Sequence, residues 1–282
     1  MPQVRPIAQP DEVALPVSPA LEIHVKNVCK SFGDNCVLRG IDLDVSCGQM
    51  VAVIGGSGSG KTTLLKLLTA QEQPDQGHVK LADHESAGAP LVDLAGLDER
   101  HLDRLRRHWA VVFQGNALFS GTVFDNLAFG LRELKQMGEP SIRKRVTEVM
   151  RSVELDAAKD LPLNVDELSG GMAKRVAIAR SLALDPIVIF YDEPTSGLDP
   201  ILTADIHALI LAVHLRRPES NTPRTSIIIT HDRDLLRRLQ PRIVMLHEGR
   251  ICFDGLFDAF AQSSSPIIRP YYELMPVLHE LH

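Results

Sequence analysis

The chain has 282 residues, of which 44% are hydrophobic, so it can bury a sizeable core as one large domain with two lobes. Its 30 basic and 36 acidic residues leave a net charge of −6, which gives no electrostatic case for binding nucleic acid. The apolar runs fall far short of the roughly 18 residues that span a bilayer, so any contact with a membrane is expected to come through a partner. The four cysteines show no Cys-x-x-Cys spacing and no signal peptide precedes them, so reduced cytosolic thiols are expected.

The first elements predicted along the chain are strands. Residues 1–20 carry five prolines without hydrophobic periodicity, which predicts a disordered or loosely packed N-terminal extension. Folding is expected to begin at Leu21, because apolar residues alternate over residues 21–25 and again over residues 41–45. These two stretches predict antiparallel strands.

Residues 55–62 read Gly-Gly-Ser-Gly-Ser-Gly-Lys-Thr and match the pattern G-x-x-x-x-G-K-[ST] of a phosphate-binding loop. A predicted buried strand precedes this loop and a predicted helix follows it, a context that a chance glycine-rich turn lacks. Glycines let several backbone N–H groups point at one anion, and the helix N-terminus adds its positive dipole. Lys61 is expected to reach the β- and γ-phosphates, and the Thr62 hydroxyl is expected to bind Mg²⁺. The candidate phosphate-binding residues are Gly55, Gly56, Ser57, Gly58, Ser59, Gly60, Lys61, Thr62 and Thr63.

The segment after this loop predicts mainly helices. The helical pattern covers residues 97–109 and 141–159, and a short strand over residues 111–114 ends in the amide of Gln114. Residues 115–129 are too apolar for an ordinary exposed loop. Their large apolar side chains either fill a lobe of helices or line a groove for a short helix of another protein. These side chains are Leu118, Phe119, Phe124 and Phe129.

Leu168-Ser169-Gly170-Gly171 precedes a further predicted helix. Ser169 can cap this helix, and Gly170 and Gly171 let backbone N–H groups approach an anion closely. By itself Ser-Gly-Gly is usually a loop, so its meaning depends on the elements around it. The apolar residues that recur at helical spacing after it, and that we expect in the core, are Met172, Val176, Ala179 and Ala183.

A strand predicted over residues 187–191 runs directly into Asp192 and Glu193. Carboxylates at the C-terminal edge of a parallel strand usually face a ligand or metal crevice, because burying unpaired charges is costly. Asp192 is expected to hold Mg²⁺, and Glu193 to polarise the water that attacks the γ-phosphate. An isolated Asp-Glu pair is more often a helix cap, and the phosphate-binding loop earlier in the chain favours the catalytic interpretation.

The remaining elements are a strand that ends in a histidine and a hairpin. Residues 227–230 predict a strand that delivers His231 at its end. Residues 243–246 and 251–254 predict two strands joined by a short turn at Gly249. No internal repeat and no second phosphate-binding loop is visible in the sequence.

These elements together resemble the ATP-binding-cassette (ABC) family, because Leu-Ser-Gly-Gly followed by a helix is a mark of that family among phosphate-loop proteins. The resemblance covers residues 21–260. It implies an α/β fold, a P-loop NTPase cassette with a RecA-like core, an antiparallel β-subdomain, and a helical signature subdomain at about residues 115–180. It also implies that ATP hydrolysis with Mg²⁺ powers transport, and it leaves residues 261–282 as a C-terminal extension.

The resemblance assigns roles to single residues. Gln114 resembles the Q-loop glutamine that senses Mg²⁺ and water and links to the membrane subunit, and His231 resembles the switch histidine at the γ-phosphate. In the family the signature segment covers the γ-phosphate held by the partner, which implies a head-to-tail homodimer. The expected catalytic residues are Glu193, His231 and Gln114, the metal ligands Thr62, Gln114 and Asp192, and the further nucleotide contacts Phe32 on adenine, Ser169, Gly170, Gly171 and the D-loop residue Asp199.

Three short stretches are similar to the ATPases of MCE-type (Mla-type) phospholipid transporters: residues 113–128, residues 168–172 with methionine at 172 where many importers have glutamine, and residues 266–271. This resemblance implies a multi-spanning membrane permease and an MCE-domain subunit as partners. Membrane contact is then expected only through the permease, on the cytoplasmic face of the inner (plasma) membrane, with no direct nucleic-acid contact. Gly56, where the Mla loop commonly has proline, and the generic sequence of residues 195–199 depart from the pattern.

Two other classes compete with phospholipid transport. An ABC ATPase for another cargo, such as amino acid import or lipoprotein release, has the same motifs. Non-transport cassette proteins are disfavoured, because DNA-repair members separate the phosphate loop from the acidic pair by hundreds of residues and translation factors usually carry two cassettes. This chain has one cassette with closely spaced motifs.

Overall fold

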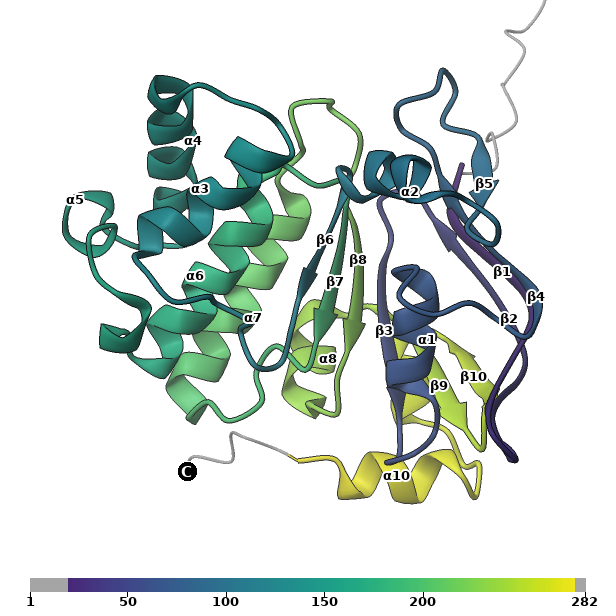
Figure 1. The fold of residues 1–282 in the computed structure, drawn as a ribbon. Helices are drawn as coiled ribbons and strands as arrows, with labels where there is room; N and C mark the ends of the chain where they lie inside the picture. The colour runs from purple at the N-terminus through teal and green to yellow at the C-terminus, as the bar shows by residue number, and fades with distance from the viewer. Residues whose placement is uncertain (1–19, 277–282) are drawn as a thin grey trace, which may run out of the picture.

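The computed structural model describes residues 20–276, so residues 1–19 of the expected N-terminal extension and the last residues of the C-terminal extension lie outside it. Two β-sheets and a lobe of helices make up the described part (Figure 1). The larger sheet is central, with the smaller sheet on one side and the helical lobe on the other. This architecture confirms the expected α/β fold.

The central sheet has six strands in the order β10-β9-β3-β8-β7-β6. Its strands are β3 (Met50–Gly55), β6 (Trp109–Val112), β7 (Val188–Asp192), β8 (Thr225–Ile229), β9 (Arg242–His247) and β10 (Arg250–Gly255). All pairs are parallel except β9 with β10, which form the expected antiparallel hairpin. The strand β3 is buried throughout because both of its faces are covered: Ala52 and Ile54 belong to one core, and Val51 and Val53 to the other.

The second sheet has four strands, all antiparallel, in the order β2-β1-β4-β5. Its strands are β1 (Leu21–Phe32), β2 (Asn35–Ser46), β4 (Gln76–Ala82) and β5 (Leu91–Asp93). The expected alternation is confirmed, because Ile23, Val25, Leu43 and Val45 are all buried. Together with helices α1 (Lys61–Leu68) and α2 (Glu99–Arg106), this sheet shares one hydrophobic core with one face of the central sheet.

Helices cover the opposite face of the central sheet. They are α3 (Val123–Glu133), α4 (Glu139–Ser152), α5 (Ala157–Asp160), a 3₁₀ turn (Val165–Glu167), α6 (Gly170–Ala183), α7 (Pro200–Leu215) and α8 (Arg233–Leu239). The helices α3, α4 and α6 pack on one another and share the second hydrophobic core with that sheet face. The last two helices are α9 (Phe257–Ala261) and α10 (Ile268–Leu274), and α10 crosses the end of the sheet where β3 leads into α1 (Figure 1).

Two predicted helix boundaries are wrong. The helix predicted to reach Trp109 ends at Arg106, because Trp109 opens β6 and packs its ring edge-on against Phe190 of the neighbouring strand, with the ring centroids 6.2 Å apart. The helix predicted over residues 141–159 stops at Ser152. Its continuation is interrupted where Glu154 adopts a left-handed φ of 58°, which a helix does not accommodate.

Candidate nucleotide-binding site

The phosphate-binding loop lies between the C-terminal end of β3 and the start of α1. Gly55, Gly58 and Gly60 of this loop have φ values of 149°, 74° and 105°, which residues other than glycine rarely adopt. A Cβ atom at Gly55 would lie 2.3 Å from the backbone oxygen of Leu246, and one at Gly60 would lie 2.5 Å from Leu38 Cδ2. The loop therefore needs glycine for its conformation and for space.

Two polar side chains of this loop, Lys61 and Ser59, could bind an anion. The Lys61 ammonium donates hydrogen bonds to the carbonyl oxygens of Gly55 at 2.8 Å and Gly56 at 3.0 Å. Burial lowers the pKa of Lys61, and the carboxylates of Glu193 and Asp192 oppose that shift. The Ser59 hydroxyl is buried without a hydrogen-bond partner among residues 20–276. This orphaned hydroxyl and the curled lysine fit a phosphate chain bound inside the loop.

The acidic pair lies at the end of β7, next to this lysine. Burial raises the pKa of Asp192, while the charges of Lys61 and Lys174 act to lower it. Glu193 adopts a left-handed φ of 46°, and its N–H donates to the carbonyl oxygen of Ile229 at 2.9 Å, at the end of the neighbouring strand β8. Backbone strain of this kind is common at functional sites. Thr62 on α1 and Asp192 offer the hard oxygen donors that Mg²⁺ prefers.

His231 meets Glu193, as the parallel strand order predicts for side chains at the ends of β7 and β8. The Nδ1 atom of His231 lies 2.8 Å from Oε2 of Glu193. The histidine is half-exposed, and the next residue, Asp232, caps α8 by accepting the N–H of Leu235 at 3.0 Å. The cap at Asp232 thus positions the backbone next to His231, and the Glu193 carboxylate contacts the imidazole.

Gln114 lies in the loop after β6 and faces the segment that follows the acidic pair. Its Nε2 donates to the Ser196 hydroxyl at 3.1 Å. Asp199 of the same segment caps α7 by accepting the N–H groups of Ile201 at 2.9 Å and Leu202 at 3.0 Å. The structure therefore joins the predicted Q-loop to the predicted D-loop within one chain.

The signature segment lies away from the phosphate-binding loop. It starts α6, which packs against one face of the central sheet, whereas α1 packs against the other (Figure 1). The Ser169 hydroxyl caps α6 by accepting the N–H of Met172 at 3.3 Å. A Cβ atom at Gly171 would lie 2.8 Å from Leu202 Cδ2, whereas one at Gly170 would meet no atom within 4 Å. The segment is therefore packed on its α7 side and open on the other.

Phe32 ends β1, and 47% of its surface is exposed. The Lys30 ammonium lies 5.3 Å from the centroid of its ring. An aromatic side chain held open in this way is not part of the core and can receive a flat ring on its free face.

The sequence did not indicate that the C-terminal extension contacts the phosphate-binding loop. The Tyr271 hydroxyl accepts the N–H of Gly55 at 3.1 Å and lies 3.3 Å from the Gly55 carbonyl oxygen, to which it can donate. The ring of the next residue, Tyr272, packs on Phe257 and Phe260 and so fixes α10 to α9. No local sequence signal could have found a contact between residues so far apart in the chain.

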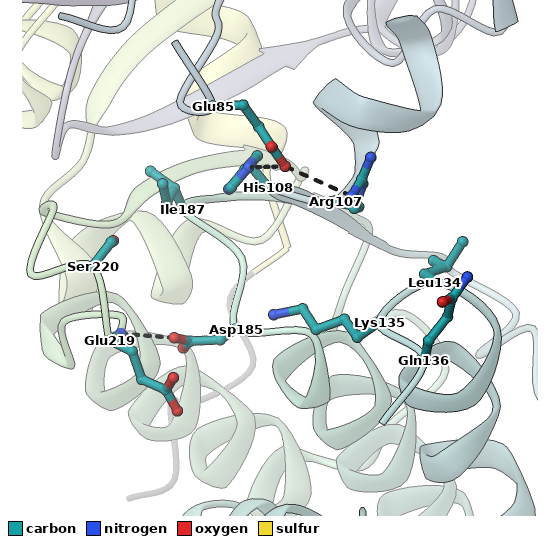
Figure 2. A pocket seen from close by; sticks show the side chains of 10 residues that line it. All are labelled: Glu85, Arg107, His108, Leu134, Lys135, Gln136, Asp185, Ile187, Glu219 and Ser220. Carbon is teal, nitrogen blue, oxygen red and sulfur yellow. Dashed lines mark hydrogen bonds and ion pairs between the residues drawn. The ribbon is translucent and has the colours of Figure 1, made fainter. Parts of the chain in front are cut away.

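A cavity of about 550 Å³ lies outside this site. Ile187, which comes directly before β7, lines it (Figure 2). The acidic pair lies at the other end of that strand. Its charges are mostly matched: Glu85 lies 3.2 Å from His108 and 3.9 Å from Arg107. No phosphate-loop residue lines it.

Comparisons with known proteins agree with this geometry. A family model described as "ABC transporter" matches residues 38–196. The chain is 35% identical over 262 residues to the protein TRIGALACTOSYLDIACYLGLYCEROL 3, chloroplastic, of Arabidopsis thaliana, covering 88% of this chain and 72% of that protein. It is 36% identical over 258 residues to the methionine import ATP-binding protein MetN of Francisella tularensis subsp. holarctica, covering 89% of this chain and 69% of MetN.

Solved structures share the fold. CbiO1 from Clostridium perfringens, part of the ABC transporter complex cbiONQ, has a TM-score of 0.73 and 29% identity, covering 86% of this chain and 92% of that chain. A dimer of the ATP-binding cassette MJ0796 bound to ADP and Pi has a TM-score of 0.70 and 29% identity, covering 83% of this chain and 98% of that chain.

The chain belongs to the ABC transporter family. It is an ATP-binding cassette that hydrolyses ATP to ADP and phosphate in support of transport. Within residues 20–276, no helix combines the length and the apolar character needed to cross a membrane.

Proposed function

We propose that two copies of the chain form a head-to-tail homodimer, in which each ATP lies between the phosphate-binding loop of one copy and the signature segment of the other. The observation that carries this proposal is the separation of the two segments: the helices that they begin, α1 and α6, pack against opposite faces of the central sheet. The open side of Gly170 leaves room for a second molecule. Backbone N–H groups and a helix N-terminus at that position suit an anion.

Within one copy, the loop and Lys61 bind and orient the phosphates. The Lys61 ammonium donates to two backbone carbonyl oxygens in the structure. Charged phosphate oxygens are stronger acceptors, so the ammonium would exchange these partners for the phosphates of ATP. Glu193, held beside His231, orients the attacking water and accepts its proton, and His231 donates to the γ-phosphate. Thr62, Asp192 and Gln114 would hold Mg²⁺, which would neutralise charge on the phosphates. Phe32 stacks on the adenine.

For the cargo, we propose phospholipid, carried by a transporter of the MCE (Mla) type with a multi-spanning permease and an MCE-domain subunit. The support is the similarity to a chloroplast protein named after a galactolipid, together with Met172 and the tail that carries Tyr271. In this account the chain is peripheral on the cytoplasmic face of the inner membrane. Methionine import is the second candidate, because MetN is equally similar.

Reconstitution distinguishes the two cargoes. The chain is purified together with its permease and accessory membrane subunits and placed in liposomes with fluorescent phospholipid. The phospholipid proposal predicts ATP-dependent transfer of the label to acceptor vesicles, or from them, and no transfer with Glu193→Gln. ATP-dependent methionine uptake without lipid transfer would replace it with the second candidate.

The permease is proposed to bind a groove on the helical lobe. Four large apolar residues within residues 115–129 divide into two pairs beside the fully buried Leu127: Leu118 and Phe124 pack against the core, whereas Phe119 and Phe129 are 37% and 56% exposed. The exposed rings lie 5.4 Å apart, beside a cavity of about 290 Å³ that Trp109 also lines. An apolar groove of this size suits a short helix.

The change Phe129→Ser tests the groove. The isolated subunit should keep its melting temperature and its affinity for ATP, because the ring is largely exposed. Co-purification with the permease should fall, and lipid transfer should fall with it. Leu215→Ser is the matched control, because this exposed residue lies on α7 away from the groove. A Phe129→Ser subunit that keeps its permease and moves lipid normally contradicts the groove at this position.

A further inference from the structure

Lys174 is a buried cation that the proposed hydrolysis does not use directly. It lies in α6, one turn beyond the signature glycines, and only 1% of its surface is exposed. Its ammonium donates to the backbone carbonyl oxygens of Gln114 at 2.9 Å and Phe113 at 3.4 Å. Within residues 20–276 it forms no ion pair, and both acceptors belong to the loop that carries Gln114.

Burying an ammonium without a carboxylate partner is costly, so ordinary core packing does not explain a lysine here. Burial lowers the pKa of Lys174, and the charge of Asp192 partly opposes this. An apolar side chain of similar length, such as methionine, would fill the same space without that cost. What methionine cannot do is hold the two carbonyl oxygens.

The hydrogen bonds continue from Gln114 to the acidic pair. The Gln114 amide donates to the Ser196 hydroxyl at 3.1 Å, and the Ser196 N–H donates to the Glu193 carbonyl oxygen at 3.2 Å. The signature helix is thereby connected through Gln114 and Ser196 to Glu193, the residue proposed to orient the water.

We propose that Lys174 is a positioning residue that ties the signature helix to the Gln114 loop. When the signature segment docks on the ATP of the partner, Lys174 then also places Gln114 at the ATP bound by its own chain. The inference rests on the proposed role of Gln114 in hydrolysis. In this proposal Lys174 acts on hydrolysis through the Gln114 backbone, which its ammonium holds.

The test compares steady-state MgATP hydrolysis and thermal melting of full-length Lys174→Met, Lys174→Arg, Gln114→Ala and the double variant Lys174→Met/Gln114→Ala. Lys174→Met should lower kcat by about tenfold, as for other residues that orient catalytic groups, with KM changed less than about twofold. Lys174→Arg should restore most of kcat because it keeps donors at this position. In the Gln114→Ala background, Lys174→Met should have no further effect on kcat.

Arg145→Met is the matched control. Arg145 also holds two backbone carbonyl oxygens of α6, those of Ala183 at 3.1 Å and Leu182 at 2.9 Å, but at the far end of the helix. Its loss should lower the melting temperature without changing kcat of the folded protein. If Lys174→Met melts below the assay temperature, all variants are assayed at a lower temperature at which Lys174→Met is folded, under the same criteria.

The outcomes separate the two proposals. Wild-type kcat in Gln114→Ala would overturn the role of Gln114 and this inference with it. A low kcat in Gln114→Ala with wild-type kcat in Lys174→Met would overturn the role of Lys174 alone. Equal fold-losses from Lys174→Met with and without Gln114 would show that Lys174 does not act through Gln114, and would also overturn the inference.

Discussion

The phosphate-binding loop and the signature segment both place glycines at the start of a helix, but their surroundings within the chain differ. Gly55 is enclosed by the Leu246 backbone and the Tyr271 hydroxyl, and Gly60 by Leu38. Gly170, by contrast, has no neighbour within 4 Å of the position that a Cβ atom would take. The chain itself surrounds Gly55 and Gly60 of the phosphate-binding loop, whereas the signature segment is open at Gly170.

This difference indicates why glycine occurs in each place. At Gly55 and Gly60 the chain itself requires it, because the positive φ and the close neighbours disfavour a side chain. At Gly170 the single chain imposes no such requirement, so we attribute that glycine to the close approach of a ligand held by a second copy. Changes in the two segments should therefore act on different properties.

The largest effect is expected at Glu193, the proposed catalytic carboxylate beside the phosphate-binding loop. Glu193→Gln removes the proton acceptor but not the phosphate contacts, so hydrolysis should fall by about 10²–10⁴-fold while ATP stays bound and the dimer persists. Steady-state ATPase rates, nucleotide retention and size-exclusion chromatography with MgATP measure this. Glu248→Gln is the control, because Glu248 has a similar left-handed φ of 48° but lies in the β9–β10 turn. Near-wild-type hydrolysis by Glu193→Gln removes Glu193 from the catalytic role.

A pair of alanine substitutions tests the comparison itself. Gly55→Ala should lower the free energy of unfolding by about 1–3 kcal/mol, because its Cβ would collide with the Leu246 backbone at a strained φ. Gly170→Ala should change it by less than about 0.5 kcal/mol and instead slow hydrolysis by the dimer. Urea unfolding and ATPase assays distinguish the two effects. Equal losses of stability would show that the signature segment is as tightly enclosed as the loop.

The smallest effect is expected where the tail contacts the loop. Tyr271→Phe removes the hydroxyl that bonds Gly55, so the free energy of unfolding should fall by about 1 kcal/mol and ATP should bind a few-fold more weakly. Tyr272→Phe is the control, because the Tyr272 ring packs on α9 and does not reach the loop. Identical ATP affinity and stability in Tyr271→Phe and wild type would mean that the tail does not support the loop.

Local patterns predicted much of the fold and of the site. The phosphate-binding loop could be placed because its strand, glycines and helix are adjacent in sequence, and the acidic pair because an apolar strand precedes it directly. These inferences need no knowledge of distant contacts. The meeting of Glu193 and His231 was not predicted, because it depends on β7 and β8 being parallel neighbours that end at one edge of the sheet.

The contacts that were missed are non-local. Tyr271 and Gly55 meet only because the tail folds back across the sheet end, which no spacing rule reports. A lysine in a helix is normally expected at the surface, yet Lys174 is buried because loop carbonyl oxygens face it. Likewise, composition alone could not separate the exposed Phe129 from the half-buried Phe124.

The central claim is that the open segment of one copy completes the closed loop of another, and mixing two inactive variants tests it most directly. Ser169→Arg places a cation where the partner's γ-phosphate must dock, and Lys61→Ala lowers the affinity of the chain's own phosphate-binding loop for ATP. Each variant alone should form no working site, although Ser169→Arg should still fold and bind ATP.

In an equal mixture, a heterodimer pairs the intact loop of the Ser169→Arg chain with the intact signature segment of the Lys61→Ala chain. Half of the dimers are then mixed, each with one of its two sites intact, so hydrolysis should recover to roughly a quarter of the wild-type rate. A mixture that stays as inactive as its components, or a Ser169→Arg protein that hydrolyses ATP normally by itself, would contradict sites shared between two copies.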